Sequence, residues 1–224
     1  EIVKIPFKKP FSMAMWTSKE KTHVVVTLIG DDGTVGVGET VPLVAEFGEP
    51  PLGIKELIEA YFTPVLIGVD IYDIEEIYRR MNAASKFHWF AKSAVDFAMY
   101  DLFGKAAGVP SYKLLGGMVT RKLPLNWVIG IQEPEEAGKE ALHYYNQGYR
   151  SFKLKNREPV SAVQTIKAVR DAVGDEPEIR IDPNQSWSVS QAIDVIKKLE
   201  PYRPECIEQP LPYWDLEGMA IVRK

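Results

Sequence analysis

The sequence predicts an α/β fold in which strand–helix units repeat along the second half of the chain. Three short apolar runs there each end in charged residues, at Phe152–Lys155, Ile179–Asp182 and Cys206–Glu208. The segments between them have the periodicity of amphipathic helices, a pattern typical of parallel strands joined by crossover helices. Since parallel strands end at one edge of their sheet, the lysines and carboxylates at these ends should converge there.

Composition narrows the class of protein. The chain has 224 residues, 46% hydrophobic and 26% charged, with a net charge of −4. The chain has no cluster of basic residues, which argues against nucleic acid as a partner. No apolar run is close to the length of about 18 residues that a membrane-spanning helix needs. We expect a trimmed N-terminus, because residue 1 is Glu, and no signal peptide. The single Cys206 excludes an internal disulfide and fits a reducing, cytoplasmic location.

The first half predicts a smaller α+β region. Residues 2–8 form a strand candidate, and 23–29 and 34–39 predict a β-hairpin around the turn Asp31-Asp32-Gly33. Between them, Pro10–Lys21 has no regular period but contains large apolar residues, Phe11, Met13, Met15 and Trp16. This segment is predicted to be either a loop packed on its own domain or a flap over a pocket.

Helical patterns follow a predicted loop at 40–52. They cover about 53–63, 73–82 and 91–107, and the last has small residues on its apolar face that would let another element approach closely. The pattern changes after Gly116-Gly117, so we assign residues 1–117 to an α+β domain and 118–224 to the repeating units.

The second half predicts strands at 123–129, 150–155, 178–182 and 205–208. Helices are expected at 133–147 and 160–173. A third helix should begin at the capping box Ser188–Gln191, and a fourth at Leu216. These make about four strand–helix units, whereas a closed (β/α) barrel needs eight. We therefore expect an incomplete barrel that belongs to a longer chain or, alternatively, is completed by assembly of copies; a homo-oligomer is expected.

The charged strand ends can carry chemistry. Lys153 and Lys155 are two residues apart on a strand and point to one side, where burial and mutual repulsion would lower their pKa values and favour proton abstraction. Asp182 and Glu208 supply oxygen ligands of the kind Mg²⁺ prefers. The alternative is that the lysines are a solvated strand end and the carboxylates are helix caps. The three histidines show no motif and are expected to be structural.

In these residues the chain resembles the enolase superfamily, in its muconate-lactonizing-enzyme branch. The matching motifs, in order, are Lys153-Leu154-Lys155, Asp182-Pro183-Asn184-Gln185 and Ile207-Glu208-Gln209-Pro210. Upstream, Gly36–Thr40, Ala94–Leu102 and Leu114–Gly117 resemble the family's capping domain. The resemblance implies a (β/α) barrel with an N-terminal α+β capping domain, and a magnesium-dependent isomerase, with Mn²⁺ as an alternative metal.

The resemblance also implies roles for single residues. Asp182 and Glu208 would be metal ligands, Lys155 a general base with Lys153 beside it, and Asn184 a support for the metal or substrate. Trp16 and Met15 would contact a small-molecule carboxylate substrate. The expected reaction removes an α-proton and leads to racemisation, epimerisation or cycloisomerisation; dehydration is the alternative outcome.

Two pieces of the family's site are expected beyond residue 224: a third metal ligand and an opposing lysine. The mandelate-racemase branch shares the K-x-K motif but pairs it with a His-Asp base, and Ile207–Pro210 favours the muconate-lactonizing branch. Two alternatives stay open on the sequence: a non-catalytic relative that keeps the fold, and an unrelated (β/α)₈ enzyme acting on phosphorylated sugars.

Overall fold

A computed structural model describes residues 1–224, with the exception of the side chain of residue 46. The chain forms two compact units. The first contains Glu1–Phe7 and Glu20–Arg121, and the second contains Lys8–Lys19 and Lys122–Lys224. The domain assignment made from the sequence, 1–117 and 118–224, stays a prediction.

The first sheet has the strand order β1-β2-β3, with β1 at Ile2–Ser12, β2 at Thr17–Ile29 and β3 at Val35–Thr40. The predicted hairpin is confirmed, because β2 and β3 pair antiparallel from Ile29↔Val35 to Val24↔Thr40. The prediction that Pro10–Lys21 is a loop was wrong: β1 and β2 continue through it and leave only residues 13–16 as a turn. Backbone pairing extends these strands where the side-chain pattern gives no strand signal.

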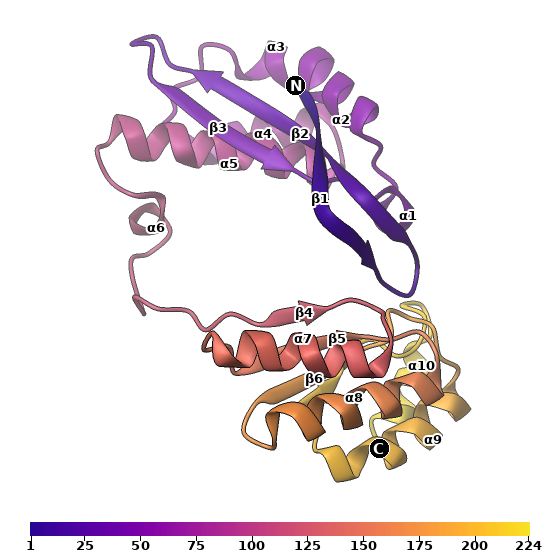
Figure 1. The fold of residues 1–224 in the computed structure, drawn as a ribbon. Helices are drawn as coiled ribbons and strands as arrows, with labels where there is room; N and C mark the ends of the chain where they lie inside the picture. Colours follow the sequence, from indigo (N-terminus) through magenta and orange to yellow (C-terminus); the bar gives the residue numbers. More distant parts are fainter. The chain divides into compact units, whose positions relative to one another are not determined.

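Helices cover this sheet in the first unit (Figure 1). They are α1 (Val44–Phe47), α2 (Pro51–Leu57), a π-helical turn (Ile58–Phe62), α3 (Thr63–Leu66), α4 (Ile74–Ala84), α5 (Trp89–Ala106) and α6 (Ser111–Leu114). The predicted loop at 40–52 therefore contains one short helix and the start of another. The helix predicted at 53–63 is a run of α, π and α turns that ends at Leu66.

The strand β3 packs directly on α5. A Cβ atom added at Gly36 would lie 2.3 Å from the carbonyl oxygen of Ala98, and one at Gly38 would lie 2.1 Å from that of Ala94. Only glycine permits this approach. The small residues predicted on this helix do allow a close neighbour, and the carboxylate of Asp101 then accepts a hydrogen bond from the Val37 N–H at 2.8 Å.

The second unit contains a four-stranded sheet of order β4-β5-β6-β7, and every neighbouring pair is parallel. Its elements in chain order are β4 (Trp127–Ile129), α7 (Pro134–Asn146), β5 (Ser151–Lys155), α8 (Pro159–Val173), β6 (Glu178–Asp182), α9 (Val189–Leu199), a 3₁₀ turn (Glu200–Tyr202), β7 (Cys206–Ile207) and α10 (Leu216–Val222). The predicted alternation is confirmed. The strand expected at 123–129 is shorter than predicted, and the segment around Pro124 stays outside the ladder.

Alternate side chains of this sheet face different environments. Phe152, Leu154, Ile179 and Ile181 are fully buried in one cluster with residues of α7, α8 and α9, which lie together on one side of the sheet (Figure 1). The residues between them in sequence are charged and project to the opposite face, as the two-residue period of a strand requires. The sheet thus has an apolar face under the helices and a charged face away from them.

None of the described helices combines the length and apolar character that crossing a bilayer would require.

Candidate active site

The strand register brings the predicted site residues to one edge of the sheet. Lys155, the last residue of β5, pairs with Asp182, the last residue of β6. Ile181 pairs with Ile207, so Glu208 follows β7 at the same level as Asp182. This is the carboxyl edge of a parallel sheet, where α/β proteins bind their ligands.

The side chains of these residues form a lysine–carboxylate cluster consisting of Lys153, Lys155, Asp182 and Glu208. Asp182 Oδ2 lies 2.6 Å from Lys155 Nζ and 2.8 Å from Lys153 Nζ. Lys153 Nζ is also 2.7 Å from Glu208 Oε1, so a single ammonium links the two carboxylates. The Asp182 side chain is 1% exposed and that of Lys155 10%, whereas Glu208 is 39% exposed and open to solvent.

Asn184 joins this cluster. Its Oδ1 accepts a hydrogen bond from Lys155 Nζ at 3.0 Å, and its backbone N–H donates to Asp182 Oδ1 at 2.9 Å. The second carboxylate oxygen of Asp182 is thereby satisfied by the backbone of its own loop. The sequence placed Asn184 near this end of the site, and the structure brings it there.

The charges of the cluster shift pKa values in a direction that differs from the expectation. Burial acts to lower the pKa of Lys153, but hydrogen bonds to Asp182 and Glu208 outweigh it and raise that pKa above its ordinary value. For Asp182, burial acts to raise the pKa, and the hydrogen bonds from Lys153 and Lys155 lower it overall. The expectation of a lowered Lys153 pKa was therefore wrong here, because each lysine faces a carboxylate and mutual repulsion does not dominate.

The loops that follow the strands are locked to one another. Asn184, Gln185 and Gln209 have positive φ values of 47°, 70° and 41°, a strained conformation for residues other than glycine. The Gln185 N–H donates to the Gln209 carbonyl oxygen at 2.8 Å, and Gln185 Oε1 accepts from the Tyr213 N–H at 2.8 Å. The loop after β6 and the loop after β7 are thus held in one arrangement around Asp182 and Glu208.

The hairpin tip at Lys8–Lys19 belongs to the same unit as the cluster. The Ile131 N–H donates to the Ser12 carbonyl oxygen at 3.0 Å, and Lys9 Nζ lies 3.5 Å from Glu140 Oε2. Trp16 packs near Phe11, with ring centroids 6.3 Å apart, and Met15 is 40% exposed. The segment is therefore attached to the second unit, and its role as a flap over a pocket stays a prediction. Substrate contact by Trp16 and Met15 stays a prediction.

Asp182 and Glu208 are the predicted metal ligands, and their oxygens lie close together. Asp182 Oδ2 and Glu208 Oε1 are both within hydrogen-bond distance of the Lys153 nitrogen, and hard oxygen donors gathered round one cation-sized position fit Mg²⁺. Among the described residues, no group of three or more His, Cys, Asp or Glu side chains is placed to hold a metal ion. The residues present thus fit two ligands of a divalent cation.

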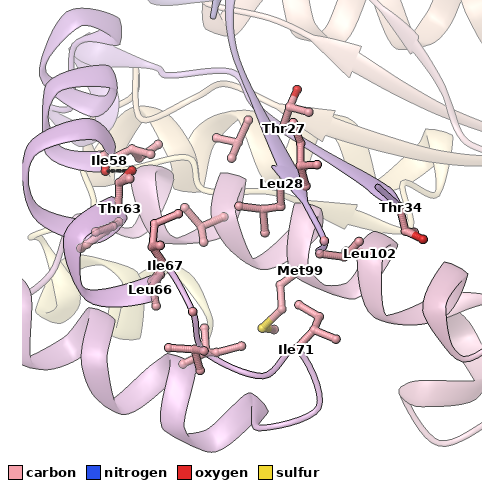
Figure 2. Close-up of a pocket in the computed structure, with 18 of the residues that line it drawn as sticks. Thr27, Leu28, Thr34, Ile58, Thr63, Leu66, Ile67, Ile71, Met99 and Leu102 are labelled. Atoms are coloured by element: carbon pink, nitrogen blue, oxygen red, sulfur yellow. Dashed lines mark hydrogen bonds between the residues drawn. The ribbon is translucent and has the colours of Figure 1, made fainter. Parts of the chain in front are cut away.

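A cavity of about 1080 Å³ lies elsewhere, inside the first unit between β2, the helical turns at 58–66 and α5 (Figure 2). Its walls include Leu28, Leu66, Ile71 and Met99, and none of the four cluster residues lines it. It is an opening in the apolar core of that unit and does not belong to the candidate active site.

Sequence inspection missed one charged neighbour of the cluster. Arg180 stands two residues before Asp182 and projects from the same face of β6, where its Nη1 is 3.6 Å from Glu208 Oε2. The signal was present as a charged residue alternating with apolar ones in Ile179–Asp182.

Parallel strand–helix units with charged groups at their carboxyl ends, together with an N-terminal α+β unit, define the class as a (β/α) protein with an additional N-terminal domain. Two family descriptions match the chain: "Mandelate racemase / muconate lactonizing enzyme, N-terminal domain" over residues 2–116, and "Enolase C-terminal domain-like" over residues 136–224. The chain belongs to the mandelate racemase/muconate lactonizing enzyme family of the enolase superfamily. The resemblance inferred from the motifs is confirmed.

The similar proteins include an epimerase and a cycloisomerase, which are both isomerases. The chain is 34% identical to L-Ala-D/L-Glu epimerase of Clostridium acetobutylicum over 97% of its length, covering 62% of that protein. It is 32% identical to muconate cycloisomerase 1 of Pseudomonas putida over 95% of its length, covering 58% of it. A crystal structure of dipeptide epimerase from Enterococcus faecalis, complexed with Mg and the dipeptide L-Leu-L-Tyr, has a TM-score of 0.94 at 34% identity, with 99% of this chain and 62% of that chain covered. The chain thus spans about three fifths of the length of these relatives.

Proposed function

We propose that the protein is a magnesium-dependent isomerase that removes the α-proton of a small carboxylate substrate. The observation that carries the proposal is the convergence of Lys153, Lys155, Asp182 and Glu208 at the carboxyl edge of one parallel sheet. A proton next to a carboxylate is very weakly acidic, so its removal needs both a placed base and compensation of the charge that develops on the substrate.

In the proposed reaction, the substrate C–H bond breaks and its electron pair moves onto the carboxylate to give an enediolate. Lys155 accepts the proton, and Asn184, which hydrogen-bonds Lys155 Nζ, holds the amine in place. Lys153 adds a cation beside the developing charge. Asp182 and Glu208 would hold Mg²⁺, which supplies Lewis-acid stabilisation of the two enediolate oxygens when bound. Delivery of a proton to the opposite face, from an acid other than Lys155, would give the epimer.

Epimerisation of a dipeptide-type substrate is the outcome we favour. The relatives named above include L-Ala-D/L-Glu epimerase at 34% identity, and the matching structure of the Enterococcus faecalis enzyme contains a dipeptide. Cycloisomerisation is the second candidate, supported by 32% identity to muconate cycloisomerase 1. Both use the same α-proton chemistry at the lysine–carboxylate cluster. The cytoplasmic location and the homo-oligomeric state stay predictions.

Exchange of the substrate α-hydrogen with solvent deuterium tests this proposal. The whole protein is incubated with L-Leu-L-Tyr and a panel of related dipeptides in D₂O containing Mg²⁺, and incorporation is followed by NMR. We expect exchange in the wild type and a loss of at least about 10²-fold in Lys155→Ala, the usual scale for removing a general base. Lys167→Ala is the matched control, because Lys167 makes only an exposed pair with Asp171 on α8.

Undiminished exchange in Lys155→Ala would remove Lys155 as the base. No exchange in the wild type with dipeptides, together with turnover of a muconate, would favour cycloisomerisation. A protein that binds Mg²⁺ and carboxylates without exchange or turnover would be the non-catalytic relative.

A further inference from the structure

Arg180 lies one layer below the carboxyl edge of the sheet. It pairs in register with Lys153 on β5 and with Cys206 on β7, whereas Asp182 is level with Lys155. A residue two positions before a strand end projects from the same face as the end residue. Arg180 therefore approaches the site from beneath, on the side away from an entering ligand.

The two oxygens of Glu208 face different cations. Oε1 accepts a hydrogen bond from Lys153 Nζ at 2.7 Å, and Oε2 is 3.6 Å from Arg180 Nη1. The other arm of the guanidinium is fixed by Glu205, whose Oε1 and Oε2 lie 3.1 Å and 3.4 Å from Arg180 Nη2. The orientation of the Glu208 carboxylate is thus defined from both sides.

The Arg180 side chain is partly buried, with 34% of its surface exposed. Its Nε atom is buried and has no hydrogen-bond partner among the described residues. Arginine keeps its charge at any accessible pH and presents a rigid planar fork, which lysine cannot reproduce.

We propose that Arg180 is a positioning residue that orients Glu208 as a ligand for the divalent cation. This inference rests on the proposed function, in which Asp182 and Glu208 hold that cation. Side chains that hold a metal-binding carboxylate in place typically change metal affinity by about 10–100-fold when they are removed. In this proposal Arg180 acts through Glu208, whose Oε2 lies 3.6 Å from Arg180 Nη1.

Binding of Mn²⁺ to the whole protein, measured from the EPR signal of the free ion, tests the inference without any assay of activity. We expect Arg180→Gln to weaken Mn²⁺ binding by about 10–100-fold. Arg180→Lys, which keeps the charge but loses the fork, should fall between Arg180→Gln and the wild type, at least about threefold weaker than the latter. The matched control is Arg150→Gln, because Arg150 makes an exposed pair with Glu176 at 3.2 Å and its variant should bind Mn²⁺ as the wild type does.

Wild-type affinity in Arg180→Gln would overturn the inference. Should that variant fail to fold, wild-type affinity in Arg180→Lys would overturn it equally. Glu208→Gln separates this result from the proposed function. If Glu208→Gln binds Mn²⁺ normally, the proposed metal site is wrong; if it loses Mn²⁺ while Arg180→Gln retains it, only the role of Arg180 is wrong.

Discussion

Asp182→Asn is the substitution whose consequence the structure defines most sharply. Asp182 is 1% exposed and accepts hydrogen bonds from two ammonium groups, at 2.6 Å and 2.8 Å. The asparagine keeps the shape and one acceptor but removes the negative charge. Lys153 retains Glu208 as a partner, whereas Lys155 is left with the neutral amide of Asn184. One buried ammonium therefore loses its counter-charge.

The magnitude follows from that single unpaired charge. Breaking a buried ion pair by removing one partner costs about 3–5 kcal/mol. Since Lys153 keeps a carboxylate, we expect the lower end of the range, about 3 kcal/mol.

Urea denaturation of the chelator-treated protein at pH 7, followed by circular dichroism, measures this change. Asp194→Asn is the matched control, because Asp194 is an exposed carboxylate on α9 and its substitution should change stability by less than about 0.5 kcal/mol. Adding Lys155→Met to Asp182→Asn should recover most of the loss, since both charged partners are then gone. A loss below about 1 kcal/mol in Asp182→Asn would refute the assignment of a buried, charge-paired carboxylate.

The contact between β3 and α5 gives two further predictions. Gly38→Ala should destabilise the protein by about 1–3 kcal/mol or more, because the new Cβ would lie 2.1 Å from the Ala94 carbonyl oxygen; an unchanged urea midpoint would contradict the close packing. Hydrogen bonds from Lys105 and from the Val37 N–H lower the pKa of Asp101, so its contribution to stability is present above its unfolded pKa of about 3.9 and is lost as the pH falls. Asp101→Asn should therefore lower the urea midpoint at pH 7, and its difference from the wild type should shrink as the pH falls below about 3.9; a difference that does not shrink in that range would contradict this origin.

Much of the fold could be predicted because local signals agreed with the tertiary structure. The capping box predicted at Ser188 and Gln191 is present, with Gln191 N–H donating to Ser188 Oγ and Ser188 N–H donating to Gln191 Oε1. The regular spacing of strands predicted a parallel sheet, which its pairing confirms. The capping box depends on residues only three positions apart, and the parallel sheet follows from the regular spacing of strands and helices along the chain.

The failures have a different origin. Strands β1 and β2 extend into Pro10–Lys21 because their backbones pair with each other. The side chains of this segment do not alternate between apolar and polar, so its sequence carries no sign of a strand. The lysine pKa was mispredicted for a similar reason. K-x-K places two like charges on one side of a strand, but the sign of the shift depends on Asp182 and Glu208, which come from other strands. Both the length of β1 and β2 and the pKa of Lys153 therefore depend on contacts between different strands.

The pairing of charges in the cluster stabilises its buried carboxylate. Lys153 and Lys155 neutralise the buried Asp182, so the strand ends need no metal to avoid an unpaired charge. In the proposed function, a divalent cation held by Asp182 and Glu208 would compete with the ammonium groups for the same carboxylate oxygens. Binding of the cation would therefore require both lysines to give up Asp182, so metal binding would be coupled to the position of the Lys155 amine.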